Sequence, residues 1–140
     1  MTFAGVNYLA VVIAAIVAWL AGAVWYMTFG KTWMAALGTT AEKMAEARSR
    51  PGALLPFIYA FAAELVMAWV LAGLIGHLGR PTLRAGVISG TFCWLGFVIT
   101  TLIVNNSLAR RDWRLLFIDG GHWLLVLLLM GAIIGAMGVS

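Results

Sequence analysis

The sequence predicts an all-α, polytopic membrane protein in which four transmembrane helices form one tight bundle and one domain, residues 1–140. Of its 140 residues, 64% are hydrophobic and 10% are charged, whereas a soluble domain has about 45–50% apolar and about 25% charged residues. Four stretches also reach the length of about 20 residues that a membrane crossing requires. These features exclude most soluble enzymes, disordered proteins and nucleic-acid-binding modules.

The four expected spans cover residues of about 4–27, 54–76, 84–104 and 115–138. At about 1.5 Å per residue each is about 32–36 Å long, enough to cross a bilayer with some tilt. They must be helical because lipid offers no partner for free backbone groups. The first span has no basic residue before Lys31, so we interpret it as a retained helix and not as a signal peptide.

A short helix is expected in the first loop. Thr39, Thr40, Ala41 and Glu42 match a capping box, which predicts a helix that begins at Thr39 and runs toward Arg48. Pro51, just beyond it, is expected to end this helix. Its polar composition predicts a position on the membrane surface.

The distribution of Lys and Arg predicts the orientation. Seven of them lie in the first and third loops and two in the second loop. Because cytoplasmic loops are enriched in Lys and Arg, we expect the first and third loops in the cytoplasm and both termini outside it. Interface anchors are expected at the cytoplasmic side: Trp25, Tyr26, Lys31, Trp33 and Trp113.

Small residues recur every four positions in the spans, and such stripes mark faces where helices approach closely. The expected packing positions are Ala10, Ala14, Ala18, Gly22, Gly86, Gly90, Gly96, Gly131 and Gly135. The pairs Gly86/Gly90 and Gly131/Gly135 lie near the outer ends of their helices, so the third and fourth spans are expected to cross there.

The fourth span has two specialised faces. Asp119 and His122 lie one turn apart and roughly opposite the glycine stripe. A helix with two such faces needs neighbours on both sides, and a small bundle offers mostly one. This pattern predicts a homo-oligomer, most simply a two-fold dimer.

Polar residues within the spans are the candidate functional residues, because charged groups there are costly. Glu64 lies near the middle of the second span, and Asp119 and His122 approach its depth from the cytoplasmic side. The three meet if the second and fourth spans are neighbours. The other candidates for a proton or ion pathway are Thr100, Asn105, Asn106 and Asn7.

Three interpretations of these residues remain open. In a structural one, Asp119 and His122 satisfy each other and Glu64 bonds across a helix interface. In a second, Glu64 and His122 change protonation as a proton or cation crosses, since histidine titrates near neutral pH. In a third, the Asp-x-x-His pattern contributes to a metal or haem site, as Glu-x-x-His does in di-iron bundles. That site needs more ligands than one chain offers, so neither a metal nor a cofactor is expected.

Several motifs resemble a widespread family of small bacterial membrane proteins catalogued as domain of unknown function 1761. The motifs are Asn7 and residues 22–26, 29–34, 94–97, 118–123 and 130–133. The resemblance covers nearly the whole chain, with residues 39–51 matching least well. It implies the four-span fold and the bacterial inner membrane. It also implies a shared pattern that includes Trp25, Tyr26, Lys31, Trp33, Asp119 and His122.

The functional hypothesis from the sequence is a small proton- or cation-linked transporter or channel that acts as an oligomer. No nucleophile lies beside a base in the pattern, so an enzyme is not expected, and nucleic acid is not an expected partner. The alternative is a scaffold or accessory subunit of a larger membrane complex. Apart from the lipid bilayer and a second copy of the chain, the sequence identifies no partner.

Overall fold

The computed structural model describes residues 5–138, and these residues form helices and connecting turns without strands. The elements are α1 (Tyr8–Leu37), α2 (Ala41–Arg48), α3 (Leu55–His77), α4 (Leu83–Cys93), η2 (Trp94–Val98), α5 (Ile99–Leu108) and α6 (Trp113–Met137). Four helical segments are long and apolar enough to cross a membrane: α1, α3, α6 and the continuous segment Leu83–Leu108. The predicted all-α class with four membrane helices is confirmed.

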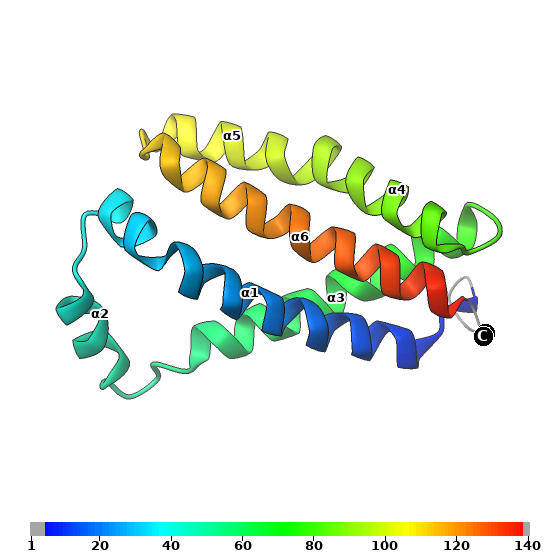
Figure 1. The fold of residues 1–140 in the computed structure, drawn as a ribbon, viewed down its shortest axis with the longest axis horizontal. Helices are drawn as coiled ribbons and strands as arrows, with labels where there is room; N and C mark the ends of the chain where they lie inside the picture. The colour runs from blue at the N-terminus through cyan, green and yellow to red at the C-terminus, as the bar shows by residue number, and fades with distance from the viewer. Residues whose placement is uncertain (1–4, 139–140) are drawn as a thin grey trace.

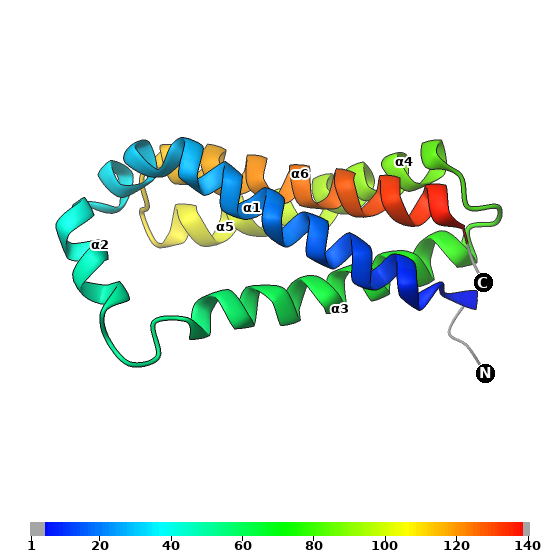
Figure 2. The same cartoon turned by 60° about the horizontal axis from the view of Figure 1, so that its bottom comes forward.

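Helix α6 is the central element of the bundle. It packs most extensively against α4 on one side and α1 on the other, while α3 packs mainly against α1 (Figure 1). The α3–α4 turn and the described ends of the chain lie at one end of the bundle, and α2 and the α5–α6 loop lie at the other (Figure 2). The seven Lys and Arg residues of the first and third loops are therefore gathered at one end.

Helix α1 extends further than expected. The predicted span ended at residue 27, but the helix continues through Lys31 and Trp33 to Leu37, because no proline interrupts this stretch. Gly38, with φ of 73°, closes the helix, and its N–H bonds to the carbonyls of Ala35 and Met34. The predicted start at residue 4 lies outside the described residues.

The short helix α2 is present, but its cap differs from the prediction. The N-cap is Thr40 and not Thr39, and its side chain accepts a hydrogen bond from the Lys43 N–H at 3.2 Å. The reciprocal half of the capping box is missing because the third helical residue is Lys43, which carries no acceptor. The helix ends at Arg48, before Pro51, and its side chains are mostly exposed.

A π-helical turn, η2, interrupts the third span and changes which residues face the bundle. A π turn inserts an extra residue into the helical repeat, so the stripe that begins at Gly86 and Gly90 does not continue on the same face. Gly96 is exposed, and a Cβ built on it contacts nothing within 4 Å. Thr100 is exposed as well. The prediction that Gly96 and Thr100 share the packing face is therefore wrong.

The close crossing of α4 and α6 is built on the other four glycines. A Cβ on Gly131 would overlap the Gly86 carbonyl oxygen and lie 2.7 Å from its carbonyl carbon. A Cβ on Gly90 would overlap the Leu127 oxygen, and one on Gly135 would overlap the Thr82 oxygen. The two backbones are in direct contact, the arrangement that small residues permit between membrane helices.

Both specialised faces of α6 are thus covered within one chain. Its glycine face packs on α4, and the face that carries Asp119 and His122 packs on α1. The expectation that one chain offers mostly one inner face is wrong, because α6 lies between two neighbours and not at the edge. The two-face pattern therefore does not require a second copy of the chain.

Candidate polar site between α1 and α6

A cluster of three polar side chains joins α1 to α6, and we call it the Tyr26 cluster: Tyr26, Asp119 and His122. The Tyr26 hydroxyl donates a hydrogen bond of 2.6 Å to Asp119 Oδ1. The His122 ring lies 4.9 Å from the Tyr26 ring, centroid to centroid, and 4.6 Å from the Trp123 ring. Asp119 and His122 follow each other by one turn on α6, so both reach the same tyrosine.

Two indole groups fix the backbone of α6 around this cluster. Trp25 Nε1–H donates to the Ile118 carbonyl oxygen at 2.9 Å from α1. Trp94 Nε1–H donates to the Gly120 carbonyl oxygen at 2.8 Å from η2. A carbonyl oxygen has two lone pairs, so each can accept an indole N–H beside its helical bond. The carbonyls on either side of Asp119 are therefore held from two neighbouring helices.

Glycines make room for the rings that cross at this point. A Cβ on Gly22 of α1 would lie 2.7 Å from His122 Nε2. A Cβ on Gly121 of α6 would lie 2.7 Å from Trp25 Cζ2. Since real Cβ atoms essentially never come within 3.0 Å of another heavy atom, both positions need glycine for the rings to keep their places. Gly22 thus belongs to the site as well as to the packing stripe.

His122 is buried, with 7% of its surface exposed, and its Nδ1 has no hydrogen-bond partner among residues 5–138. Asp119 bonds to Tyr26, and no hydrogen bond joins it to His122 in the part of the chain that the structure describes. The structural interpretation in which Asp119 and His122 satisfy each other does not match this geometry. The imidazole keeps an unused polar atom inside the bundle.

Glu64 lies apart from the Tyr26 cluster. Trp19 of α1 donates to the Phe57 carbonyl oxygen at 3.1 Å and stacks edge-on against Phe61. Because α1 and α3 run antiparallel, Glu64 lies further along, level with residues of α1 before Trp19. The Tyr26 cluster lies on the other side of Trp19, so the separation along α1 is on the order of 10 Å. The expected meeting of Glu64 with Asp119 and His122 does not occur.

Glu64 is nevertheless buried, with 2% of its surface exposed, and its Oε1 has no hydrogen-bond partner among the described residues. Its neighbours on the inner face of α3 are the buried Ala68 and Leu71. A polar oxygen enclosed in this way is costly unless something bonds to it. Glu64 is thus a second isolated polar point inside the bundle.

The remaining candidates are dispersed. Asn7 caps α1 at the far end of the bundle, where its Oδ1 accepts from the Ala10 N–H at 3.2 Å. Thr100 donates to the Gly96 carbonyl of its own helix, and Asn105 is exposed. Asn106 is buried and lines a pocket at the α5–α6 loop. Within residues 5–138, no group of three His, Cys, Asp or Glu side chains is placed to hold a metal ion.

The sequence alone assigned Tyr26 to the interface and gave Trp94 no role. Tyr26 is the hydrogen-bond partner of Asp119, and Trp94 fixes the Gly120 carbonyl. One signal pointed to the first contact, since Tyr26 and Asp119 were both expected near the cytoplasmic ends of their spans. No comparable signal existed for Trp94, because its direction depends on the π turn that it opens.

The fold and this site define a multi-pass membrane protein with a polar cluster inside its helical bundle. The chain belongs to the family described as "Protein of unknown function (DUF1761)", whose model matches residues 9–135. The resemblance drawn from the motifs is thereby confirmed. The search of curated proteins and the search of solved structures each gave no match.

Proposed function

We propose that this chain is a small proton- or cation-linked transporter in which the Tyr26 cluster binds the proton. The observation that carries the proposal is the 2.6 Å hydrogen bond from Tyr26 to Asp119 beside a buried His122 whose Nδ1 has no partner among the described residues. Ionisable groups inside membrane spans are functional candidates by default, because a purely structural bond can be made without them.

The chemistry of the three groups suits a proton site. A carboxylate accepts a proton, imidazole accepts and releases one, and a phenol hydroxyl both donates and accepts a hydrogen bond. Tyr26 lies on α1 while Asp119 and His122 lie on α6. Protonation of Asp119 would weaken its charge-assisted bond to Tyr26, and it would thereby loosen the contact between the two helices. Glu64 supplies a second acceptor on the order of 10 Å away.

The test is proton and cation flux into proteoliposomes that contain the purified chain and a pH-sensitive dye. We expect the wild type to carry flux under an imposed membrane potential or a Na⁺ or K⁺ gradient. Asp119→Asn and His122→Gln are expected to abolish it and Glu64→Gln to reduce it. The matched controls are Glu46→Gln, on the exposed α2, and His77→Gln, at the far end of α3.

Absence of flux in the wild type under all of these gradients would refute the proposal. So would equal flux in the wild type and in both Asp119→Asn and His122→Gln, provided that each variant is shown to be folded by its thermal transition in detergent. Loss of flux in Glu46→Gln or His77→Gln as well would show that the effect is not specific to the cluster.

We further propose that the protein works as an oligomer through the outward face of η2. Phe92, Leu95 and Phe97 are exposed there around Gly96, which has open space beside it. The same face would serve a scaffold or accessory subunit of a larger membrane complex. Mass spectrometry after gentle extraction distinguishes the two: a bare homo-oligomer supports the transporter, and a different protein in fixed stoichiometry supports the scaffold.

For the location, we propose the bacterial inner membrane with the α2 end of the bundle in the cytoplasm. The support is the charge count of seven Lys and Arg in the first and third loops against two in the second. Cysteine labelling tests it. With Cys93 replaced by alanine, a cysteine introduced by Ser49→Cys is expected to react only after the membrane is made permeable.

A further inference from the structure

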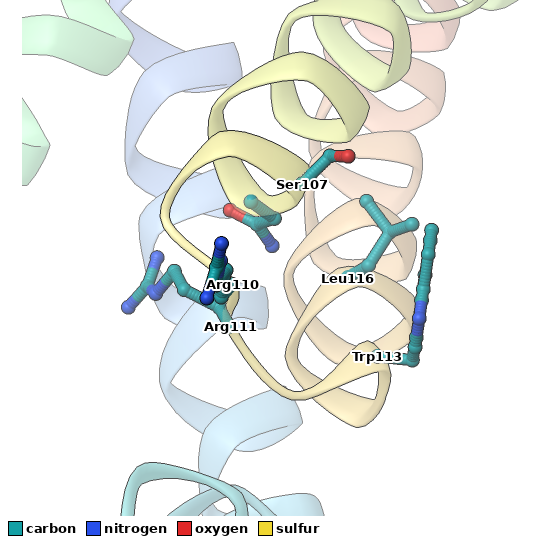
Figure 3. Close-up of a pocket in the computed structure, with 6 residues that line it drawn as sticks. Ser107, Arg110, Arg111, Trp113 and Leu116 are labelled. Atoms are coloured by element: carbon teal, nitrogen blue, oxygen red, sulfur yellow. The ribbon is translucent and has the colours of Figure 1, made fainter.

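A pocket of about 270 Å³ lies where the chain turns from α5 to α6. Its lining residues are Asn106, Ser107, Arg110, Arg111, Trp113 and Leu116. Figure 3 shows Arg110 and Arg111 on the loop, Ser107 at the end of α5, and Trp113 and Leu116 on the first turn of α6. The pocket opens at the end of the bundle that holds α2 and most of the Lys and Arg residues.

Asn106 contributes an unused donor to this pocket. It is 5% exposed, and its Nδ2 has no hydrogen-bond partner among residues 5–138. Its backbone carbonyl is already occupied, since it accepts from the Arg111 N–H at 2.9 Å. A buried amide N–H is costly when it bonds to nothing. An acceptor oxygen inside the pocket would satisfy it.

Two guanidinium groups beside this donor are also unused. Neither Arg110 nor Arg111 forms an ion pair within the described part of the chain, whereas Arg114 pairs with Asp112 at 2.8 Å. The hydrogen bonds from Arg114 hold the pKa of Asp112 below its usual range. The single carboxylate of this loop is thus committed to Arg114, and the positive charge at the pocket is not neutralised by it.

The backbone presents both arginines at the end of α5. The Arg111 N–H reaches the Asn106 carbonyl, and the Arg110 N–H reaches the Ser107 carbonyl at 3.2 Å. These two bonds form a Schellman motif, in which the position of Arg110 is usually glycine. Arg110 adopts φ of 54°, the left-handed conformation that glycine takes without strain. The loop therefore keeps a cation where glycine would fit better.

We propose that this pocket binds the phosphate group of an anionic phospholipid. The guanidinium groups of Arg110 and Arg111 and the amide of Asn106 supply donors, which together match phosphate oxygens. Trp113 is exposed beside them and Leu116 forms the apolar wall, so acyl chains can continue along α6 from the bound headgroup. Inorganic phosphate offers the same oxygens without chains, and the experiment separates the two sources.

The experiment uses the purified full chain in a neutral detergent and follows its thermal transition. The added probes are short-chain phosphatidylglycerol, phosphatidylcholine with the same chains, and inorganic phosphate. We expect phosphatidylglycerol to stabilise the wild type in a saturable manner and phosphatidylcholine to have little effect. Loss of two charge-assisted bonds in the double variant Arg110→Gly/Arg111→Gln is expected to weaken binding by about tenfold or more.

Arg114→Gln is the matched control, because it removes one charge from the same loop but does not line the pocket. It is expected to change the affinity by no more than about twofold, as exposed ion pairs contribute little. Asn106→Leu gives a second readout. It removes the unsatisfied donor, so we expect the lipid-free chain to be at least as stable as the wild type while phosphatidylglycerol binds more weakly.

The outcomes separate cleanly. Saturable binding of phosphatidylglycerol with no effect of inorganic phosphate identifies a lipid headgroup, whereas competition by inorganic phosphate identifies a soluble phosphate as the occupant of the same site. An equal response to phosphatidylcholine overturns the proposal. So does an equal loss of affinity in Arg114→Gln and in the double variant, because charge on the loop in general would then account for the binding.

Discussion

The crossing of α4 and α6 allows one packing contribution to be isolated by two glycine substitutions. Gly131→Ala places a methyl group against the Gly86 backbone, 2.7 Å from its carbonyl carbon. No side chain can move aside there, because the clash is with backbone, and the two helices must separate. Gly96→Ala adds the same methyl group to the same bundle where nothing lies within 4 Å.

The expected magnitudes follow from what the two substitutions share. Each replaces glycine by alanine within a helix, which by itself favours the helix by about 0.5–1 kcal/mol. Only Gly131→Ala adds overpacking, typically about 1–3 kcal/mol. The difference between the two free energies of unfolding therefore reports the packing cost, about 1–3 kcal/mol, with Gly131→Ala the less stable.

The assay is reversible unfolding in detergent micelles or bicelles, followed by circular dichroism across a denaturant series. Oligomer formation is checked for both variants, since a change at Gly96 can also affect contacts between chains. If the two variants differ by less than about 0.5 kcal/mol, the backbones do not touch at Gly131 as described, and the packing argument fails. A preference for Gly131→Ala over Gly96→Ala would contradict it outright.

Three further predictions concern the site and the α5–α6 loop. Trp94→Phe removes the donor to the Gly120 carbonyl and is expected to lower the free energy of unfolding by about 1 kcal/mol, measured by the same unfolding series. Gly22→Ala pushes against His122 Nε2 and is expected to shift the imidazole resonances in NMR spectra at a cost of about 1 kcal/mol. Asp112 has a lowered pKa in the folded chain, so its stabilising effect is present above its unfolded value of about 3.9 and is lost as the pH falls through the folded pKa; Asp112→Asn is expected to lose this part of the pH dependence of unfolding.

The architecture was readable from the sequence because it depends on local patterns. Four apolar stretches predict four helices, since lipid permits no other spanning structure made of single segments. The pairs Gly86/Gly90 and Gly131/Gly135 lie where α4 and α6 touch, because small residues at this spacing leave one flat strip on a helix. These inferences need only the residues of one segment at a time.

Features that depend on departures from a regular helix were not readable. The π turn at Trp94–Val98 rotates every later residue of the third span, so a uniform helical period wrongly placed Gly96 on the inner face. The hydrogen bond between Tyr26 and Asp119 depends on how α1 and α6 are aligned. That alignment is set by contacts such as the one between Gly22 and His122, which no single segment reveals.

The two faces of α6 divide the bundle into a rigid part and a part that can respond to protonation. At Gly131 the backbones of α4 and α6 are in contact, so these helices form one unit that cannot slide without separating. At Asp119 the joint is made of side chains: the hydroxyl of Tyr26 and, one residue along each helix, the indole bond of Trp25 to Ile118. A change of charge at Asp119 therefore acts first on the contact with α1, and α1 is the element that we expect to move during transport.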